Sequence, residues 1–293
     1  MIDFLMSNYI QIVIFLFLFT FLLSVALEKP KQEILTIMKS SLMERSLFAN
    51  FILLPILGLI LICLFRLPPE ISVGFLMVAL VPGGMLGLHF ARLAKGNLAY
   101  AVGLIFLLSL LSIVITPMLI SLIFPSIAQS DGFIVSLLGR LLLFITPPLL
   151  VAQIVQHWLP SIAMKVQQLS SFLSIFLFIT LTVVTSRFKV LDTQALGWNG
   201  LAAIMVFIGM AWFVGWQMGG PELENRKVLA ITSSMRNVAI CFLITTNTLV
   251  SKDTESMLFA FNVLLTPMNL VFAEAMKRIQ PKSEKEVKQA DAD

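Results

Sequence analysis

Nine long apolar stretches limit what this sequence can fold into more than any other feature. They run roughly over residues 9–27, 46–66, 71–94, 97–124, 133–157, 165–185, 198–218, 226–248 and 255–277. A helix needs about 20 mostly apolar residues to cross the hydrocarbon core of a bilayer. The apolarity is nearly continuous and lacks the alternation of a membrane β-strand. We therefore expect an all-α integral membrane protein with about nine transmembrane helices.

The scarcity of charge agrees with this interpretation. Only 12% of the 293 residues are charged and 58% are hydrophobic, whereas a soluble protein carries roughly 25% charged residues. Too few polar side chains are present to cover a soluble globule of this size. The composition excludes an ordinary soluble enzyme, a nucleic-acid-binding protein and a disordered protein, and it predicts membrane lipid as the surrounding partner.

The lysine and arginine residues predict the orientation in the membrane. Apart from Arg236, they lie near loops or helix ends, 14 on one side of a nine-helix arrangement and 5 on the other. Because basic residues concentrate on the cytoplasmic side, we expect a multi-pass protein of the cell membrane with its N-terminus outside and its C-terminus in the cytoplasm. The net charge of +4 then reflects topology and gives no sign of nucleic-acid binding.

A Thr-Pro dipeptide predicts an internal repeat. Thr116-Pro117 in the fourth stretch recurs as Thr266-Pro267 in the ninth, about 150 residues later, and an unusual stretch precedes each. Chance recurrence of the dipeptide is the alternative. However, the first four stretches pair with the sixth to ninth stretches at similar offsets along the sequence. A shift by five helices, an odd number, reverses direction across the membrane, as in the inverted repeats of secondary transporters. The predicted divisions are a first four-helix repeat over 1–127, a second repeat with one extra helix over 128–278, and a disordered cytoplasmic tail over 279–293.

The third stretch contains Val81-Pro82-Gly83-Gly84, with Gly87 about one turn later. Proline removes a backbone donor and glycine loosens a helix, so this stretch predicts a helix broken in the middle of the membrane. An unwound segment at that depth is tolerated where it lines a cavity or is covered by protein. The alternative is a kink that brings small residues to a helix contact.

The eighth stretch carries Thr232-Ser233-Ser234-Met235-Arg236-Asn237 near its middle. An arginine there costs at least about 2.5 kcal/mol on insertion, and no aspartate or glutamate lies centrally in any stretch. An unpaired cation at this place favours an anionic ligand, or neutralisation by backbone carbonyls at broken helix ends. The alternative is a purely structural arginine satisfied by carbonyls and hydroxyls alone.

Other polar residues in the stretches are weaker candidates. His89 follows the first predicted break and is the candidate proton carrier if transport is coupled to protons, although a packed histidine is the more common case. Asn262, Thr116, Thr266 and Asn269 lie on the helices that follow the two unusual stretches. Such residues often serve as interhelical contacts, but here they occupy equivalent places in the two repeats.

These motifs together resemble the bile acid:sodium symporter family. The first region comprises Pro82-Gly83-Gly84, Leu93-Ala94-Lys95-Gly96-Asn97 and Thr116-Pro117, and the second comprises Ser234-Met235-Arg236-Asn237 and Thr266-Pro267. The resemblance implies nine or ten helices in two inverted repeats, with a panel domain beside a core domain in which two broken helices cross. It also implies alternating access for organic anions, with a cavity beside the crossover.

The chain departs from that family at the positions that hold sodium. The family places a Ser-Asn pair shortly after the Pro-Gly-Gly motif, and the matching positions here are Gly87 and Leu88. Its glutamate and glutamine fall on Thr232 and Arg236. Sodium prefers several hard oxygen ligands, whereas a guanidinium is a permanent cation. We therefore expect a sodium-independent relative in which Arg236 replaces the coupling cation, with no metal site and no cofactor, sodium being a candidate whose usual ligands are mostly absent.

The function predicted from these features is secondary transport of small organic anions by alternating access. A transporter-like sensor or partner protein that no longer transports, and a channel, are the alternatives. An enzyme is not expected, because the membrane stretches offer one histidine and no central carboxylate. The substrate, the direction of transport and the oligomeric state stay open. The predicted binding residues are Gly84, Gly87, His89, Thr116, Thr232, Ser233, Ser234, Arg236, Asn237, Asn262 and Thr266, with Pro82 and Gly83 as the hinge of the crossover.

Overall fold

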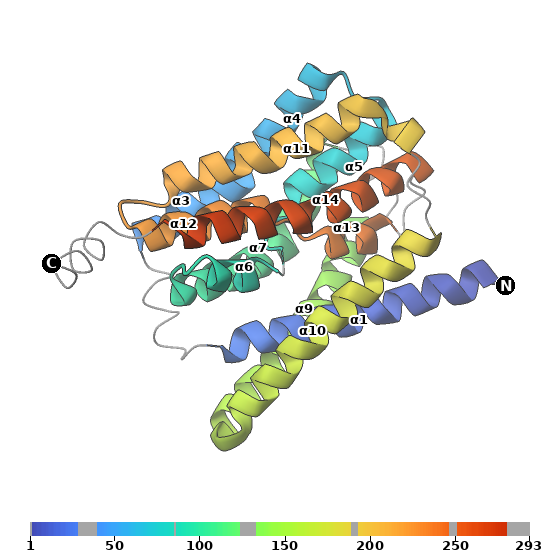
Figure 1. Cartoon of the computed structure of the whole chain (residues 1–293). Coiled ribbons are helices and arrows are strands. Elements are labelled where there is room, and N and C mark those ends of the chain that lie inside the picture. The colour runs from blue at the N-terminus through green and yellow to red at the C-terminus, as the bar shows by residue number, and fades with distance from the viewer. Residues whose placement is uncertain are drawn as a thin grey trace, which may run out of the picture.

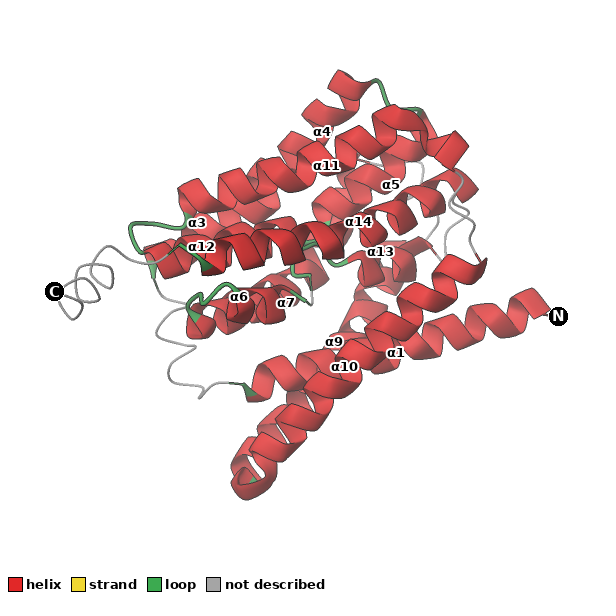
Figure 2. Ribbon diagram, in the orientation of Figure 1, coloured by secondary structure: helices red, strands yellow, loops and turns green. Residues whose placement is uncertain are grey.

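Helices form the regular elements of the chain wherever the computed structural model describes it, which is over residues 2–28, 40–84, 86–123, 133–188, 193–245 and 251–279 (Figures 1 and 2). The described residues of the nine apolar stretches lie largely on these helices, and the third and the eighth stretch are each interrupted between two helices. The predicted tail falls outside the described residues except for Ile279. The elements are α1 (Ile2–Leu27), α3 (Ser41–Phe48), the π-helix η1 (Ala49–Leu53), α4 (Leu54–Phe65), α5 (Pro69–Leu80), α6 (Gly87–Leu93), α7 (Leu98–Ile123), α9 (Phe133–Trp158), α10 (Pro160–Phe188), α11 (Thr193–Met218), α12 (Leu223–Ser234), α13 (Val238–Thr245) and α14 (Lys252–Lys277).

Several of these helices are long and apolar enough to cross a membrane. Within the described ranges there are four by length and composition, or five when two halves of α7 that meet at 52° are counted as one span. The four are Ser41–Phe65, Pro160–Thr180, Leu196–Met218 and Lys252–Lys277. Interrupted helices such as α5, with 12 residues, are too short to pass this test alone. The helices support a multi-pass membrane protein, and the number nine stays a prediction.

Large apolar side chains point outward on several helices. Leu64 is 68% exposed, Leu122 is 75% exposed and Phe172 is 67% exposed. A soluble monomer rarely leaves so much apolar surface open to water. In a bilayer the lipid tails take the place of water, so these side chains need no protein cover.

The helices form two groups that lie one below the other in Figure 1. The lower group contains α1, α9 and α10, and within it the rings of Phe17 and Phe178 lie 5.6 Å apart, centroid to centroid. The remaining helices form the larger group. Glu28, just after α1, accepts a hydrogen bond from Gln167 of α10 and forms an ion pair with Arg92 of α6. Its carboxylate therefore joins the two groups at this end.

Three phenylalanines form the centre of the larger group. The ring of Phe75 in α5 lies 5.5 Å from that of Phe207 in α11 and 6.3 Å from that of Phe261 in α14. Phe207 and Phe261 are 5.8 Å apart, and all three pairs meet edge to face. Edge-to-face pairs add stabilisation beyond the burial of apolar surface. The cluster holds α5, α11 and α14 together where the site described below is built.

Both unusual stretches are interrupted helices. α5 ends at Leu80 and α6 begins at Gly87, while α12 ends at Ser234 and α13 begins at Val238. In the first, Pro82 has no N–H to continue the helix, and Gly83 has a φ of 87° that favours glycine. The interruption at Pro82 and Gly83 is confirmed, and the alternative of a simple packing kink is wrong.

Candidate functional site

The two interruptions cross and pair through their backbones. Pro82 and Arg236 form an isolated antiparallel bridge. The Gly84 N–H donates to the Met235 carbonyl over 2.9 Å, and the Asn237 N–H donates to the Val81 carbonyl over 3.0 Å. Backbone groups that the broken helices leave unpaired are thus satisfied by each other inside the protein, as an apolar environment requires.

Gly84 permits this close approach. A Cβ atom added to Gly84 would lie 2.5 Å from the carbonyl carbon of Met235 and 2.7 Å from the amide nitrogen of Arg236. Real Cβ atoms do not approach backbone that closely, so any larger residue forces the two segments apart. Gly84 is therefore a requirement of the crossing, and its predicted binding role stays a prediction.

Arg236 lies at the crossing and is only 2% exposed. Its Nη1 donates to Asn50 Oδ1 over 3.0 Å, and its Nη2 donates to the Ala79 carbonyl over 2.6 Å and to the Asn50 carbonyl over 3.4 Å. The guanidinium carbon lies 5.9 Å from the centre of the Phe207 ring, within the range of a cation–π contact. These bonds all go to neutral oxygens, so they leave the positive charge uncompensated by an anion.

The end of α5 supplies part of this environment. Because α5 ends at Leu80, its last carbonyls have no helical N–H four residues further on. The Ala79 carbonyl accepts from Arg236 instead, and the Leu80 carbonyl accepts from Thr116 Oγ1 over 3.4 Å. The C-terminus of a helix carries partial negative charge, which favours a cation there. This part of the site agrees with the expected neutralisation by carbonyls at a broken helix end.

Asn50 is a hydrogen-bond partner of Arg236 that the sequence did not predict. It lies in the π-helix η1, in which each carbonyl pairs with the N–H five residues on, as Ala49 does with Leu54. The next such donor would be Pro55, which has no N–H. The Asn50 carbonyl is consequently open to Arg236. The sequence did contain a signal for this site. Pro55 lies five residues after Asn50, so it cannot donate to the Asn50 carbonyl in a π-turn, and π-turns often mark functional sites.

One nitrogen of the Arg236 guanidinium has no hydrogen-bond partner. Its Nε is buried and makes no hydrogen bond in the structure, although the other guanidinium nitrogens are bonded as described. Oxygens of the protein therefore satisfy Nη1 and Nη2, as expected for a purely structural arginine, but they do not satisfy Nε.

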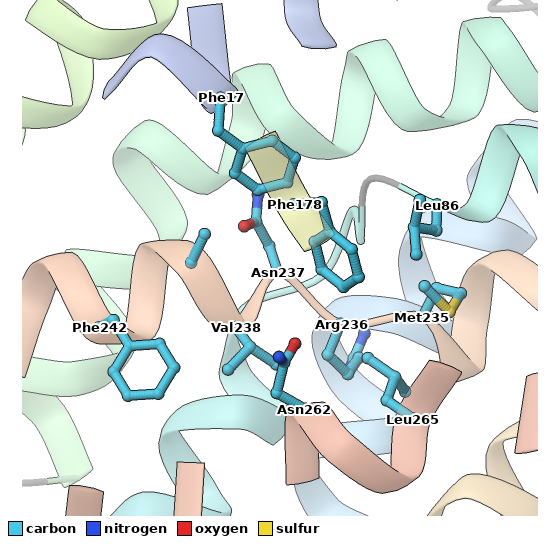
Figure 3. A pocket seen from close by; sticks show the side chains of 11 residues that line it. Phe17, Leu86, Phe178, Met235, Arg236, Asn237, Val238, Phe242, Asn262 and Leu265 are labelled. Atoms are coloured by element: carbon cyan, nitrogen blue, oxygen red, sulfur yellow. The ribbon is translucent and has the colours of Figure 1, made fainter. Parts of the chain in front are cut away.

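A small pocket lies beside the crossing (Figure 3). Of the predicted binding residues, Arg236, Asn237 and Asn262 line it. Phe17 of α1 and Phe178 of α10 form the facing wall, so the pocket lies between the two helix groups. Its cavity volume is about 30 Å³, which is enough for about one water molecule. Organic ligands occupy pockets of about 300 Å³ or more, so one would enter here only after the two groups separate.

Asn237 also caps the helix that begins at the pocket. Its Oδ1 accepts a hydrogen bond from the Ile240 N–H over 3.3 Å, which satisfies one of the free donors at the start of α13. The positive end of this helix dipole adds to the charge of Arg236. The pocket is therefore electropositive.

The hydroxyls predicted around Arg236 point elsewhere. Thr232 donates to the Val228 carbonyl of its own helix over 2.8 Å, and Ser233 accepts from Asn50 Nδ2 over 3.3 Å. Ser234 donates to Asn269 Oδ1 over 2.5 Å. None of the three lines the pocket, because successive helical residues point in different directions.

The remaining predicted residues do not line the pocket. His89 lies half-buried on α6 and does not line it. Thr116 bonds to the end of α5, as described above. Thr266 Oγ1 is buried without a hydrogen-bond partner, and Asn269 accepts from Trp212 Nε1 over 3.0 Å as well as from Ser234. Asn269 thus serves as an interhelical contact, the alternative that the sequence left open.

Two of the positions matched to the family's sodium ligands, Gly87 and Thr232, lie close together. A Cβ atom on Gly87 would lie 3.6 Å from Thr232 Cγ2, so a methyl group rather than an oxygen faces Gly87. No cluster of three or more histidine, cysteine, aspartate or glutamate side chains occurs in the part of the chain that the structure describes. The loss of the sodium site and the sodium independence inferred from the sequence stay predictions.

The lipid-facing helices and the paired interruptions define a multi-pass membrane protein with a polar crossing at its centre. Residues 11–193 match the Sodium Bile acid symporter family, and the chain belongs to that family. The family is one of transporters rather than enzymes, as predicted. Arg236 lies beyond the matched residues, and the structure pairs its segment with the interruption inside them.

Two curated plant proteins are similar over part of the chain. One is "Probable sodium/metabolite cotransporter BASS3, chloroplastic" of Oryza sativa subsp. japonica, which is 24% identical over 191 residues, covering 64% of this chain and 44% of that protein. The protein of the same description from Arabidopsis thaliana is 22% identical over 191 residues, with 64% and 43% covered. The match thus spans less than half the length of either relative.

Proposed function

We propose that the protein is a secondary transporter of small organic anions that works by alternating access. The electropositive pocket beside the crossing is the observation that carries this proposal. It combines the buried charge of Arg236, the N-terminus of α13 and the amide of Asn262. An anion bound there would complete the interactions of a cation that otherwise contacts only neutral groups.

The closed pocket supports the alternating-access part of the proposal. Phe17 and Phe178 belong to the group of α1, α9 and α10, and Arg236 belongs to the other group. A rigid-body movement between the two groups would open the space between them. In this proposal α1, α9 and α10 form the panel domain and the remaining helices form the core domain, with nine spans in inverted repeats over 1–127 and 128–278. The N-terminus lies outside the cell and the C-terminus lies in the cytoplasm.

We also propose that Arg236 takes the place of a coupling sodium ion. The residues at the family's sodium positions offer no carboxylate, and a guanidinium supplies a permanent positive charge. Three neutral oxygens at the end of α5 and in η1 hold this charge in place. Sodium would then be unnecessary both for assembling the crossing and for attracting the substrate.

A ligand screen followed by uptake tests this function. The purified protein is heated with a panel of small carboxylates, sulfonates and phosphates, and each anion that raises the melting temperature is then supplied in radiolabelled form to proteoliposomes. Uptake that saturates with concentration supports a transporter. Stabilisation by an anion without any uptake favours the alternative, a transporter-like sensor, for which the missing sodium ligands are the supporting observation. No stabilisation and no uptake across the panel would contradict both.

A further inference from the structure

Two helices, one from each helix group, run from the pocket beside the crossing to the same end of the molecule. Phe17 of α1 and Leu86, the N-cap residue of α6, both line the pocket. Glu28 follows Phe17 by 11 residues, which is about 16 Å along a helix, and Arg92 lies in the last turn of α6. The ion pair between Glu28 and Arg92 therefore joins the far ends of these two helices.

Glu28 is held in place by its own helix group. Its Oε2 accepts a hydrogen bond from Gln167 Nε2 of α10, and its Oε1 accepts from Arg92 Nη2 of α6. Gln156 of α9 donates to the Ala26 carbonyl over 2.9 Å, which fixes the end of α1. The lower group thus presents one oxygen of a positioned carboxylate to the larger group.

The Glu28–Arg92 contact is the one ion pair that joins the two groups among the residues that the structure describes. The second ion pair of this part of the chain, Lys277 with Glu274, lies within α14. The Glu28 side chain is 12% exposed and that of Arg92 is 43% exposed, and a pair with one solvated partner is of modest strength. Glu28 also keeps its bond to Gln167 when the pair breaks. The contact can therefore open without leaving a carboxylate unpaired.

We propose that Glu28 and Arg92 form a latch, which holds the two helix groups together at this end and opens before a ligand passes between the pocket and the surface here. The latch rests on the alternating-access movement proposed above and assigns one of its closing contacts. Because α6 follows the crossing directly, the latch ties α1, α9 and α10 to one of the two interrupted helices. The charge distribution of the sequence predicts this end to be cytoplasmic.

Access to the pocket tests the latch without any substrate. Ala239 lines the pocket and is 7% exposed, so Ala239→Cys, in a protein whose Cys63 and Cys241 are both replaced by alanine, places a single thiol there. A membrane-impermeant maleimide reaches this thiol only when the groups separate, and its labelling rate then reports the open population. The reagent is added to membrane vesicles of either orientation. Lys95→Cys, at an exposed position three residues after Arg92, identifies the vesicles that present this end to the reagent.

Single charge removals open the latch. Glu28→Gln and Arg92→Gln are each expected to raise the labelling rate of the pocket thiol from this end about tenfold, because the closed form loses a hydrogen bond between charged groups. The rate from the opposite side should not rise. Glu274→Gln, which removes an ion pair within a single helix, is the matched control and should label at the rate of the protein with the pocket thiol alone.

Charge reversal separates the ion pair from general damage to the fold. Glu28→Arg alone places two arginines together and should label faster than Glu28→Gln, since like charges repel. Glu28→Arg combined with Arg92→Glu restores opposite charges and should bring the labelling rate back towards that of the protein with the pocket thiol alone. Gel filtration of each variant measures its folded fraction.

Two results would overturn the latch. The first is labelling of Glu28→Gln and Arg92→Gln that is no faster than that of Glu274→Gln. The second is fast labelling that persists when Glu28→Arg and Arg92→Glu are combined. Uptake is measured separately, so the two proposals fail differently. Saturable uptake with unchanged labelling contradicts the latch and supports the transporter, whereas latch-dependent labelling without uptake of any anion supports the latch and contradicts transport.

Discussion

Arg236 and Asn50, 186 positions apart in the chain, are joined by a 3.0 Å hydrogen bond from Nη1 to Oδ1. The bond ties the second interrupted helix to the π-turn that follows α3. Together with the Ala79 and Asn50 carbonyls it holds a buried cation at the crossing with neutral oxygens alone. The charge is thus fixed in position at the crossing, and our proposal is that an anion in the neighbouring pocket interacts with it.

Asn50→Ala is expected to destabilise the protein. The change removes the acceptor of Arg236 Nη1 and the donor to Ser233, so a buried charged group loses a partner and the free energy of unfolding falls by about 2–3 kcal/mol. Asn199→Ala, at an exposed position of α11, is the control and should change it by less than about 0.5 kcal/mol. Chemical unfolding in detergent measures both. Equal stability of the two variants would show that Asn50 does not hold Arg236.

Gly84→Ala is expected to disturb the crossing itself. The added methyl group would lie 2.5 Å from backbone, and such overpacking lowers the free energy of unfolding by about 1–3 kcal/mol. Gly209→Ala is the matched control, because nothing lies within 4 Å of its added Cβ, and it should be neutral or stabilising, since alanine favours a helix by about 0.5–1 kcal/mol over glycine. The melting temperature of Gly84→Ala should therefore fall below that of the wild-type protein, and that of Gly209→Ala should stay the same or rise. A Gly84→Ala protein as stable as Gly209→Ala would rule out the close approach.

Asn269→Ala is expected to leave Trp212 Nε1 without an acceptor and to remove one of the two acceptors of Ser234 Oγ. Asn269 Oδ1 receives both Ser234 Oγ and Trp212 Nε1, and the loss should lower the free energy of unfolding by about 1–3 kcal/mol. Because Ser234 and Asn269 share one bond, the effects of Ser234→Ala and Asn269→Ala should not add in the double variant. Full additivity, measured by the same unfolding experiment, would contradict a direct contact between α12 and α14 at this point.

The features that the sequence predicted well carry a local signal. Proline followed by two glycines, as at Pro82-Gly83-Gly84, favours an interruption of a helix, and a lone arginine in an apolar stretch needs a special environment. The second interruption has neither proline nor glycine between Ser234 and Val238. It was expected from the resemblance to the family, in which two broken helices cross, and its pairing with Gly84 explains how the backbone is satisfied there.

The features that escaped prediction depend on contacts across the fold. The residues next to Asn50 in the sequence do not indicate that Arg236 is its partner, because the two meet only after α5, α11 and α12 have packed. The same holds for the serines of α12, one of which faces Asn50 and the other Asn269. Sequence shows that such hydroxyls lie in a membrane helix, and only packing decides which of them face a pocket.

Initial uptake rates of a transported anion in proteoliposomes, with sodium or with choline as the only added cation, test the central claim most directly. The wild-type protein and Lys252→Gln, an exposed control, should transport equally well in both media. Arg236→Gln should lose uptake in choline while its folded fraction, checked by gel filtration, stays comparable, because the fixed cation at the crossing is gone. A wild-type protein that transports only with sodium, or an Arg236→Gln protein that transports normally without it, would contradict the role assigned to Arg236.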